Sequence, residues 1–245
     1  MEQQIKIKIP GTKKYIYGVL RGSVRQPLVI LVHGLTGHRD AHIFYNGARF
    51  LERHGFSSFR FNLYDFAKDA RKLDECTLQT HADDLDAVVA YFRKNGVRKI
   101  CVIGHSYGGP TILLSRKKDF DVVVLWDPTY GKSVALKKDV VYLRGLRKYY
   151  LAGWSCKIMV GKEMVDFSEK VSDMKSNDWI ASMHVPVKII LAEKSMHVER
   201  GRGYYAPANQ PKAFAIVKNA DHCFNTDGTE EQLFKETLSW IRKYA

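Results

Sequence analysis

Six short runs of residues constrain the fold of this 245-residue chain more than any other feature. Each run is five residues long and, taken together, they are mostly apolar, which is typical of strands buried on both faces of a sheet. The runs are residues 28–32, 57–61, 99–103, 122–126, 187–191 and 213–217. Between them lie stretches with hydrophobic residues at helical spacing, such as residues 41–54 and 80–94. This alternation predicts an α/β fold with a mostly parallel sheet between layers of helices.

The segment between the fourth and fifth runs is too long for a simple connection. About 60 residues separate these two strands, whereas an ordinary connection in an α/β unit needs only a few. The segment contains apolar residues of its own, including a candidate β-hairpin at residues 157–165. We therefore predict a core domain of residues 1–128 and 186–245, interrupted by a cap or lid insertion of residues 129–185.

The composition narrows the class of protein. Lys and Arg number 39 against 26 Asp and Glu, and the resulting net charge of +13 suits an anionic surface or ligand. No apolar run approaches the ~18 residues of a membrane span, and the first residues lack the apolar core of a signal peptide. The four cysteines are widely spaced, as in a protein of a reducing compartment. We expect a cytoplasmic, globular protein without a transmembrane segment.

A serine flanked by glycines comes directly after the third run. The sequence Gly104-His105-Ser106-Tyr107-Gly108 lies between a predicted strand and a predicted helix. A tight strand-to-helix turn exposes the serine hydroxyl at the carboxyl end of the sheet, and glycines are needed there because a Cβ would collide with the adjoining elements. The N–H groups at the start of the helix would also stabilise negative charge near Ser106. This context predicts a nucleophilic serine rather than an ordinary glycine-rich turn.

In these features the chain resembles the α/β-hydrolase superfamily. The shared motifs are Leu31–Gly34 after an early strand, the serine motif in the middle, and Asn219–His222 near the end. The resemblance implies an eight-stranded, mostly parallel sheet flanked by helices, and a Ser–His–acid triad. It also implies a frequent cap after the sixth strand, which is where the long insertion falls.

The resemblance further suggests the partners of the serine. The backbone N–H groups of Leu35 and Tyr107 would form an oxyanion hole for a tetrahedral intermediate. His222 is the best-placed base, because it follows the last predicted strand and precedes the last helix. His33 is expected to brace the loop that carries Leu35 rather than to carry protons.

The remaining histidines have no predicted catalytic role. His105, inside the serine motif, is expected to be structural. His38 and His42 are four residues apart, but no third ligand accompanies them, so we expect no metal site and no cofactor. Four others have no partner that the sequence suggests: His54, His81, His184 and His197.

The acid of the triad is where the sequence departs from the family pattern. Most members carry an Asp in the turn after the seventh strand, but Ser195 occupies that position here. Two carboxylates can substitute for it. Glu193 lies two residues earlier, and Asp127 ends the sixth strand before Pro128, as in a lipase branch of the superfamily. We favour Asp127 over Glu193, and both stay open.

Positive charge is concentrated in the predicted lid. Residues 132–162 contain eight Lys or Arg and a single acidic residue, Asp139. One interpretation is an ordinary solvated face whose long side chains cover apolar surface. Another is that the lid attracts anionic acyl substrates or makes weak contact with acidic membranes. Nucleic acid is not expected as a partner, since no recognised binding motif is present.

Together these features predict a serine hydrolase that cleaves small-molecule carboxylic esters or thioesters, including anionic ones, without a metal or organic cofactor. Amide or peptide cleavage and acyl transfer use the same triad and remain alternatives. A further alternative is a protein of the same fold that has no catalytic activity and serves as a ligand binder or scaffold. The sequence does not indicate the acyl-chain length or the oligomeric state.

Overall fold

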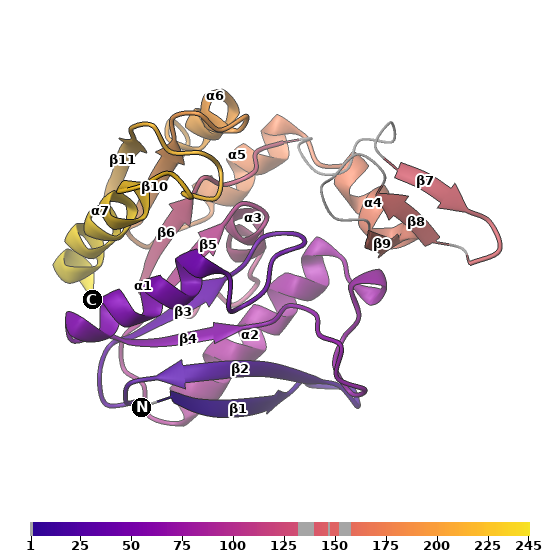
Figure 1. The fold of residues 1–245 in the computed structure, drawn as a ribbon, viewed down its shortest axis with the longest axis horizontal. Coiled ribbons are helices and arrows are strands. Elements are labelled where there is room, and N and C mark those ends of the chain that lie inside the picture. Colours follow the sequence, from indigo (N-terminus) through magenta and orange to yellow (C-terminus); the bar gives the residue numbers. More distant parts are fainter. Residues whose placement is uncertain (1, 132–139, 147, 152–157) are drawn as a thin grey trace.

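An eight-stranded sheet forms the centre of the molecule in the computed structural model, which describes residues 2–131, 140–146, 148–151 and 158–245 (Figure 1). The strand order is β1-β2-β4-β3-β5-β6-β10-β11, in which β1 and β2 are antiparallel to their neighbours and the other strands are parallel. The strands are β1 (Glu2–Lys8), β2 (Tyr15–Arg21), β3 (Leu28–Val32), β4 (Ser57–Phe61), β5 (Ile100–His105), β6 (Val122–Trp126), β10 (Val187–Ala192) and β11 (Lys212–Val217). The predicted mostly parallel, eight-stranded sheet is confirmed.

Helices cover both faces of this sheet. Leu28, Ile30 and Val32 of β3 point into one hydrophobic cluster, and Val29 and Leu31 point into the other, so the central strands are buried on both sides. The first cluster includes residues of α2 (Leu78–Lys94), α3 (Gly108–Leu113) and α5 (Asp173–Ala181). The second includes residues of α1 (His42–Arg53) and α7 (Thr229–Tyr244).

Local sequence sets where the longest of these helices begins. Thr77 is the N-cap of α2, and its side-chain oxygen accepts a hydrogen bond from the N–H of Thr80. The hydroxyl of Thr80 in turn accepts from the N–H of Thr77, so two otherwise unpaired donors are satisfied. Leu85, Val88 and Phe92 then lie on one buried face, which packs on the sheet.

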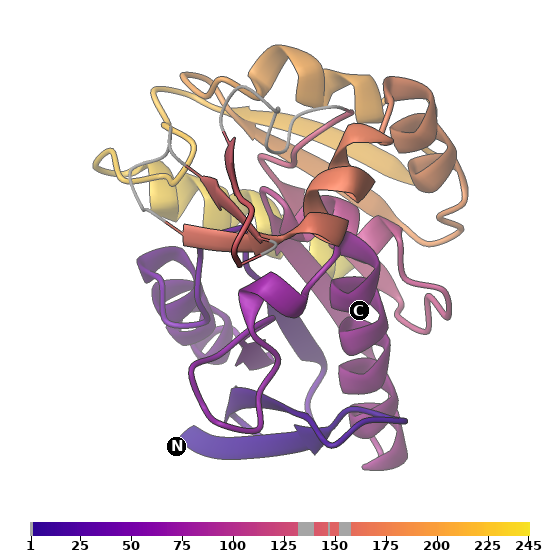
Figure 2. The same cartoon turned by 90° about the vertical axis from the view of Figure 1, so that its right-hand side faces the viewer.

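We call the segment between β6 and β10 the insert (residues 129–185), and its described residues form a small sheet and two helices. Its strands β7 (Val140–Leu143), β8 (Lys148–Leu151) and β9 (Ile158–Gly161) are antiparallel, and α4 (Lys162–Glu169) follows β9 directly. The hairpin predicted at residues 157–165 is therefore wrong, because its second half is helical and β9 pairs with β8 instead. Figures 1 and 2 show the small sheet and α4 at the end of the molecule away from α7.

The last part of the insert packs into the hydrophobic core of the main sheet. Ile180 and Met183 pack in the same cluster as the central strands, although they lie within residues 129–185. The division of the chain at residue 185 therefore stays a prediction. The described residues also form three helices of three or four residues each: η1 (Leu73–Glu75), α6 (Val198–Gly201) and η3 (Arg202–Tyr204). Among the described helices, none is long and apolar enough to cross a bilayer.

Candidate active site

The carboxyl edge of the sheet brings together the three side chains nominated from the sequence. Ser106 follows β5, Asp127 follows β6, and His222 lies in the loop after β11. Parallel strands end at a common edge, so residues that are far apart in the chain become neighbours there.

Hydrogen bonds join these three side chains in a row. His222 Nδ1 lies 2.6 Å from Asp127 Oδ2, and His222 Nε2 lies 3.0 Å from Ser106 Oγ. With the ring proton on Nδ1 donated to the carboxylate, Nε2 is free to accept the hydroxyl proton of Ser106. The serine is partly exposed, so an incoming carbonyl group can reach it.

Ser106 sits on a sharp turn that the surrounding residues enforce. Its φ is +54°, a left-handed conformation that non-glycine residues adopt at a cost of order 1–3 kcal/mol. Its N–H donates to the carbonyl of Trp126, and its own carbonyl accepts from the N–H of Thr129. A Cβ on Gly104 would lie 2.4 Å from the carbonyl oxygen of Gly108, so a side chain cannot fit there.

Asp127 is held as firmly as the serine. Its φ is +41°, its side chain is fully buried, and its N–H donates to the carbonyl of Ile190 at 2.7 Å. Oδ1 accepts the N–H of Ala192 at 3.1 Å, while Oδ2 accepts from His222. A buried carboxylate is costly unless both oxygens are hydrogen-bonded, and here each has a donor.

Glu193, the alternative acid, lies on the next strand end and is hydrogen-bonded elsewhere. Its carboxylate accepts from the N–H of Asn219 at 2.9 Å and from the Lys218 ammonium at 2.6 Å. These two bonds lower the pKa of Glu193. Ser195, at the position of the usual family acid, accepts the N–H of His197.

The loop after β3 lies against the serine. A Cβ on Gly34 would be 2.9 Å from the Cβ of Ser106, so only glycine allows this approach. His33 braces the loop, because its Nδ1–H donates to the carbonyl of Gly34 and its Nε2 accepts the N–H of Leu63. Burial lowers the pKa of His33 to about 4, which keeps the ring neutral for both bonds.

The two backbone amides proposed as oxyanion donors belong to residues next to this contact between Gly34 and Ser106. Leu35 follows Gly34, Tyr107 follows Ser106, and both side chains are buried in one cluster. Within the described residues, neither backbone N–H donates to a protein acceptor. Unpaired N–H groups beside a serine are available to a developing negative charge.

The ring of His222 packs against two other imidazoles. The centroids of His105 and His197 are each 4.7 Å from its centroid. His105 donates from Nε2 to the carbonyl of His222 at 2.8 Å, and burial, followed by the nearby His222, lowers its pKa to about 3. His105 is therefore neutral and positions the loop of His222. His197, for which the sequence suggested no role, has its pKa lowered chiefly by burial.

His38 and His42, which are four residues apart, are each hydrogen-bonded to a protein group. His38 Nδ1 accepts the N–H of Asp40, and His42 Nδ1 lies 2.9 Å from a carboxylate oxygen of Glu230. Among the described residues, no group of three or more His, Cys, Asp or Glu side chains is arranged to hold a metal ion.

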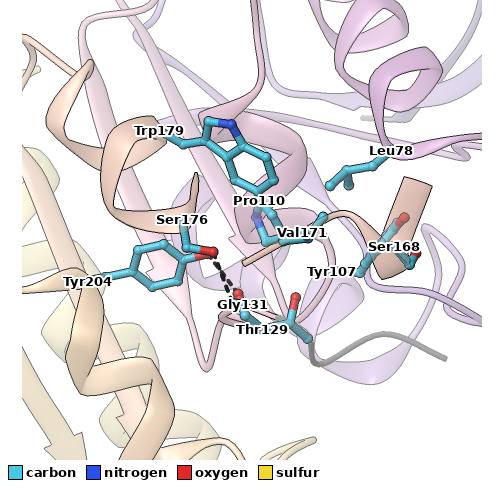
Figure 3. A pocket seen from close by; sticks show the side chains of 10 residues that line it. All are labelled: Leu78, Tyr107, Pro110, Thr129, Gly131, Ser168, Val171, Ser176, Trp179 and Tyr204. Atoms are coloured by element: carbon cyan, nitrogen blue, oxygen red, sulfur yellow. Dashed lines mark hydrogen bonds between the residues drawn. The ribbon is translucent and has the colours of Figure 1, made fainter. Parts of the chain in front are cut away.

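A small, mainly apolar pocket lies between α3 and the insert, and Ser106 is not among its lining residues (Figure 3). Its lining includes Tyr107, which follows Ser106, and Thr129, whose N–H donates to the serine carbonyl. The hydroxyl of Thr129 is buried and has no hydrogen-bond partner in the described part of the chain. The other lining residues are Leu78, Pro110, Gly131, Ser168, Val171, Ser176, Trp179 and Tyr204.

His81 gives a pH-dependent prediction for stability. The residue is fully buried next to Tyr107, neither ring nitrogen has a hydrogen-bond partner among the described residues, and burial lowers its pKa to about 3. Because the unfolded ring titrates near 6.5, the unfolded state binds an extra proton below that pH, and stability falls as pH drops from about 6.5 toward 3. His81→Phe removes this loss. Urea denaturation measures the change in the free energy of unfolding that His81→Phe causes. This change should be about 2 kcal/mol more stabilising at pH 5 than at pH 7.5.

The exposed His184 provides the matched control for this measurement. His184→Phe should change the free energy of unfolding equally at the two pH values. An equal change at both pH values for His81→Phe as well would contradict the assignment of His81 as a buried, neutral histidine.

Comparison with known proteins agrees with the architecture. A family model described as alpha/beta hydrolase fold matches residues 27–115. No curated protein matches the chain in sequence. Many solved structures are similar in fold. An esterase domain from Rhodothermus marinus has 16% identity and a TM-score of 0.76, covering 100% of this chain and 99% of that one.

Two further structures show the same similarity. Est1E from Butyrivibrio proteoclasticus, solved with ferulic acid, has 18% identity and a TM-score of 0.77, with 97% of this chain and 99% of that chain covered. The α/β hydrolase GrgF from Penicillium sp. sh18 has 15% identity and a TM-score of 0.83, with 100% and 99% covered. At these identities the likeness concerns the fold. The strand order and these matches together show that the chain has the α/β-hydrolase fold.

Proposed function

We propose that this protein is a serine hydrolase that cleaves carboxylic esters or thioesters. The observation that carries the proposal is the hydrogen-bonded row of Ser106, His222 and Asp127 at the carboxyl edge of the sheet. A serine hydroxyl is a weak nucleophile unless a base accepts its proton, and a base needs a fixed orientation to do so. In this row His222 is the base, and Asp127 fixes the orientation of its ring.

In the first half of the reaction, Ser106 Oγ attacks the carbonyl carbon of the substrate while its proton passes to His222 Nε2. The tetrahedral intermediate collapses when the imidazolium returns that proton to the leaving oxygen or sulfur, which leaves the acyl group on Ser106. Water then repeats the sequence, losing its proton to His222 and releasing the acid.

Asp127 and the two free amides act on the charges that form. The Asp127 carboxylate accepts Nδ1–H, which selects the productive tautomer and stabilises the imidazolium. The N–H groups of Leu35 and Tyr107 stabilise the oxyanion, and each such donor contributes roughly 3–4 kcal/mol in acyl transfer.

The pocket between α3 and the insert has room for about one water-sized group, and Ser106 is not among its lining residues, so it does not define where an acyl group binds. A structure of similar fold is described as an esterase domain, and another contains ferulic acid, which agrees with a carboxylic acyl substrate.

A fluorophosphonate probe tests the proposal directly, because it labels an activated serine covalently. We expect the intact protein to be labelled, and Ser106→Ala to lose the label entirely, as read from probe fluorescence on a gel. The control is Ser195→Ala, which leaves the hydrogen-bonded row in place and should be labelled like the parent. Absence of labelling in the intact protein would favour the silent ligand-binding alternative.

The choice among acyl substrates needs a separate measurement. A panel of esters, thioesters and amides with matched acyl groups separates ester hydrolysis from amide or peptide cleavage, and product analysis with added alcohols detects acyl transfer. We expect the esters and thioesters to be turned over fastest, since their leaving groups need less protonation by His222.

A further inference from the structure

We infer that the insert positions the oxyanion hole, with Met164 of α4 as the positioning residue. Met164 holds the side chain of Tyr107, and through it the backbone N–H that would stabilise the oxyanion of the substrate. The inference rests on the proposed function, because it assigns a further role in the same reaction. It gives the insert a part in the chemical step that is independent of any part in covering a substrate.

The side chains of both proposed oxyanion residues are buried in a cluster that the insert helps to form. Among the described residues, neither Leu35 nor Tyr107 belongs to the two hydrophobic clusters that flank the main sheet. Both belong to a third cluster, to which the insert contributes Val160 of β9 and Met164 and Val165 of α4. The other buried members of this cluster are Cys76 and Leu78.

Met164 contacts Tyr107 directly. The Tyr107 hydroxyl donates to Sδ of Met164 at 2.8 Å, and both side chains are buried. Burial raises the pKa of Tyr107, so the hydroxyl keeps its proton and remains a donor. Figure 3 shows Tyr107 beside Ser168, which lies one turn after Met164 on the buried side of α4. The side chain that follows the serine is therefore held by the insert.

The rest of the protein fixes the insert at this point. A Cβ on Gly161, the residue before α4, would lie 2.4 Å from the carbonyl oxygen of Asp74, so β9 lies tightly against η1. The Lys148 ammonium pairs with the Asp74 carboxylate, which connects β8 to the same short helix. Val160 points opposite to the exposed Met159 and into the cluster. Met164 thus rests on a part of the insert that is packed against the core domain.

The position of the Tyr107 side chain constrains the direction of its backbone N–H. Ser106, directly before it, has a φ of +54°, and a conformation of this kind persists only where the surrounding packing enforces it. The carbonyl of Tyr107 accepts both the N–H and the hydroxyl of Thr111. With the ring held by Met164 and the carbonyl held by Thr111, the N–H has a fixed direction. A misplacement of about 1 Å can cost on the order of 10²-fold in rate.

The relative turnover of an ester and its matching thionoester tests the inference. The thionoester carries sulfur in place of the carbonyl oxygen, and donors placed for oxygen stabilise it less well. Met164→Ala should lower kcat for the ester about 10- to 100-fold with little change in KM. It should lower kcat for the thionoester much less, so the ester-to-thionoester ratio falls about tenfold. A merely structural defect would lower both rates alike.

Two variants serve as controls. Met159→Ala removes a 40% exposed side chain from the opposite face of β9 and should match the parent in kcat and in the ratio. Met164→Leu fills nearly the same volume, so it should restore most of kcat and most of the ratio.

Failure of this inference is distinct from failure of the proposed function. If the parent is not labelled by the fluorophosphonate probe and does not turn over the ester, the proposed function is wrong and the inference is wrong with it. If the parent is labelled and active, the inference alone is wrong when Met164→Ala keeps the parental ratio, whether kcat is unchanged or both rates fall alike, or when it changes KM alone. Circular dichroism checks that the variant is folded. If it is not, Val165→Ala, which removes two methyl groups from the same cluster, decides the outcome by a fall or constancy of the ratio.

Discussion

Replacing His222 with alanine is expected to lower kcat on the order of 10⁶-fold, because the serine then has no base and the leaving group has no acid. The loss should appear in kcat with little change in KM, since the ring exchanges a proton with the Ser106 hydroxyl, an interaction that acts on the chemical step. Steady-state kinetics on an activated ester measure both parameters. The slow residual rate would come from the oxyanion donors and from substrate binding.

The exposed His184 again gives the control for this substitution. His184→Ala should retain the activity of the parent. A His222→Ala protein that keeps more than a few per cent of kcat would show that another group takes the serine proton, and the proposed mechanism would then be wrong. Retained thermal stability of the variant separates loss of chemistry from loss of fold.

The sheet was predictable because burial leaves a direct trace in the sequence. Strands such as Leu28–Val32 and Val122–Trp126 are apolar at every position, since both of their faces contact helices. The serine turn was predictable for a similar reason. Each flanking glycine occupies a place where a Cβ would overlap backbone, so the local sequence has little freedom.

The insert was less predictable because its elements are short and partly exposed. Residues 157–165 contain two short apolar runs, 158–160 and 164–165, which suit the two strands of a hairpin, but the strand ends at Gly161 and a helix begins at the next residue. Met164, Val165 and Ser168 form the buried side of that helix, a spacing that three residues alone do not distinguish from a strand. Tertiary contacts with Tyr107 and η1 decide the outcome.

Contacts between loops at the carboxyl edge of the sheet could also not be predicted from the sequence. His197 precedes a short helix after β10 and packs on His222, yet no motif links the two. The choice between Asp127 and Glu193 was open for the same reason, because both follow the ends of neighbouring strands. What separates them in space is the left-handed backbone of Asp127 and the hydrogen bonds that hold Glu193 to Asn219 and Lys218.

Activity measurements on these two carboxylates should separate their roles by a large factor. Asp127→Asn is expected to lower kcat about 10⁴-fold, because a carboxamide can donate to Nδ1 and so place the ring proton on Nε2, where it cannot accept from Ser106. The amide oxygen can still accept the N–H of Ala192, so the buried site stays filled. Glu193→Gln is the matched control and should alter kcat by less than about twofold, since an exposed ion pair contributes little.

The opposite result has a definite meaning for the mechanism. If Glu193→Gln caused the large loss and Asp127→Asn did not, the loop that carries His222 would have to move during turnover and exchange its carboxylate partner. Fluorophosphonate labelling rates distinguish this from a folding defect, because they report the activation of Ser106 in each variant before any product is released. A slow rate for Asp127→Asn together with a parental rate for Glu193→Gln would assign the imidazole orientation to the carboxylate that ends β6, the partner that lies 2.6 Å from Nδ1.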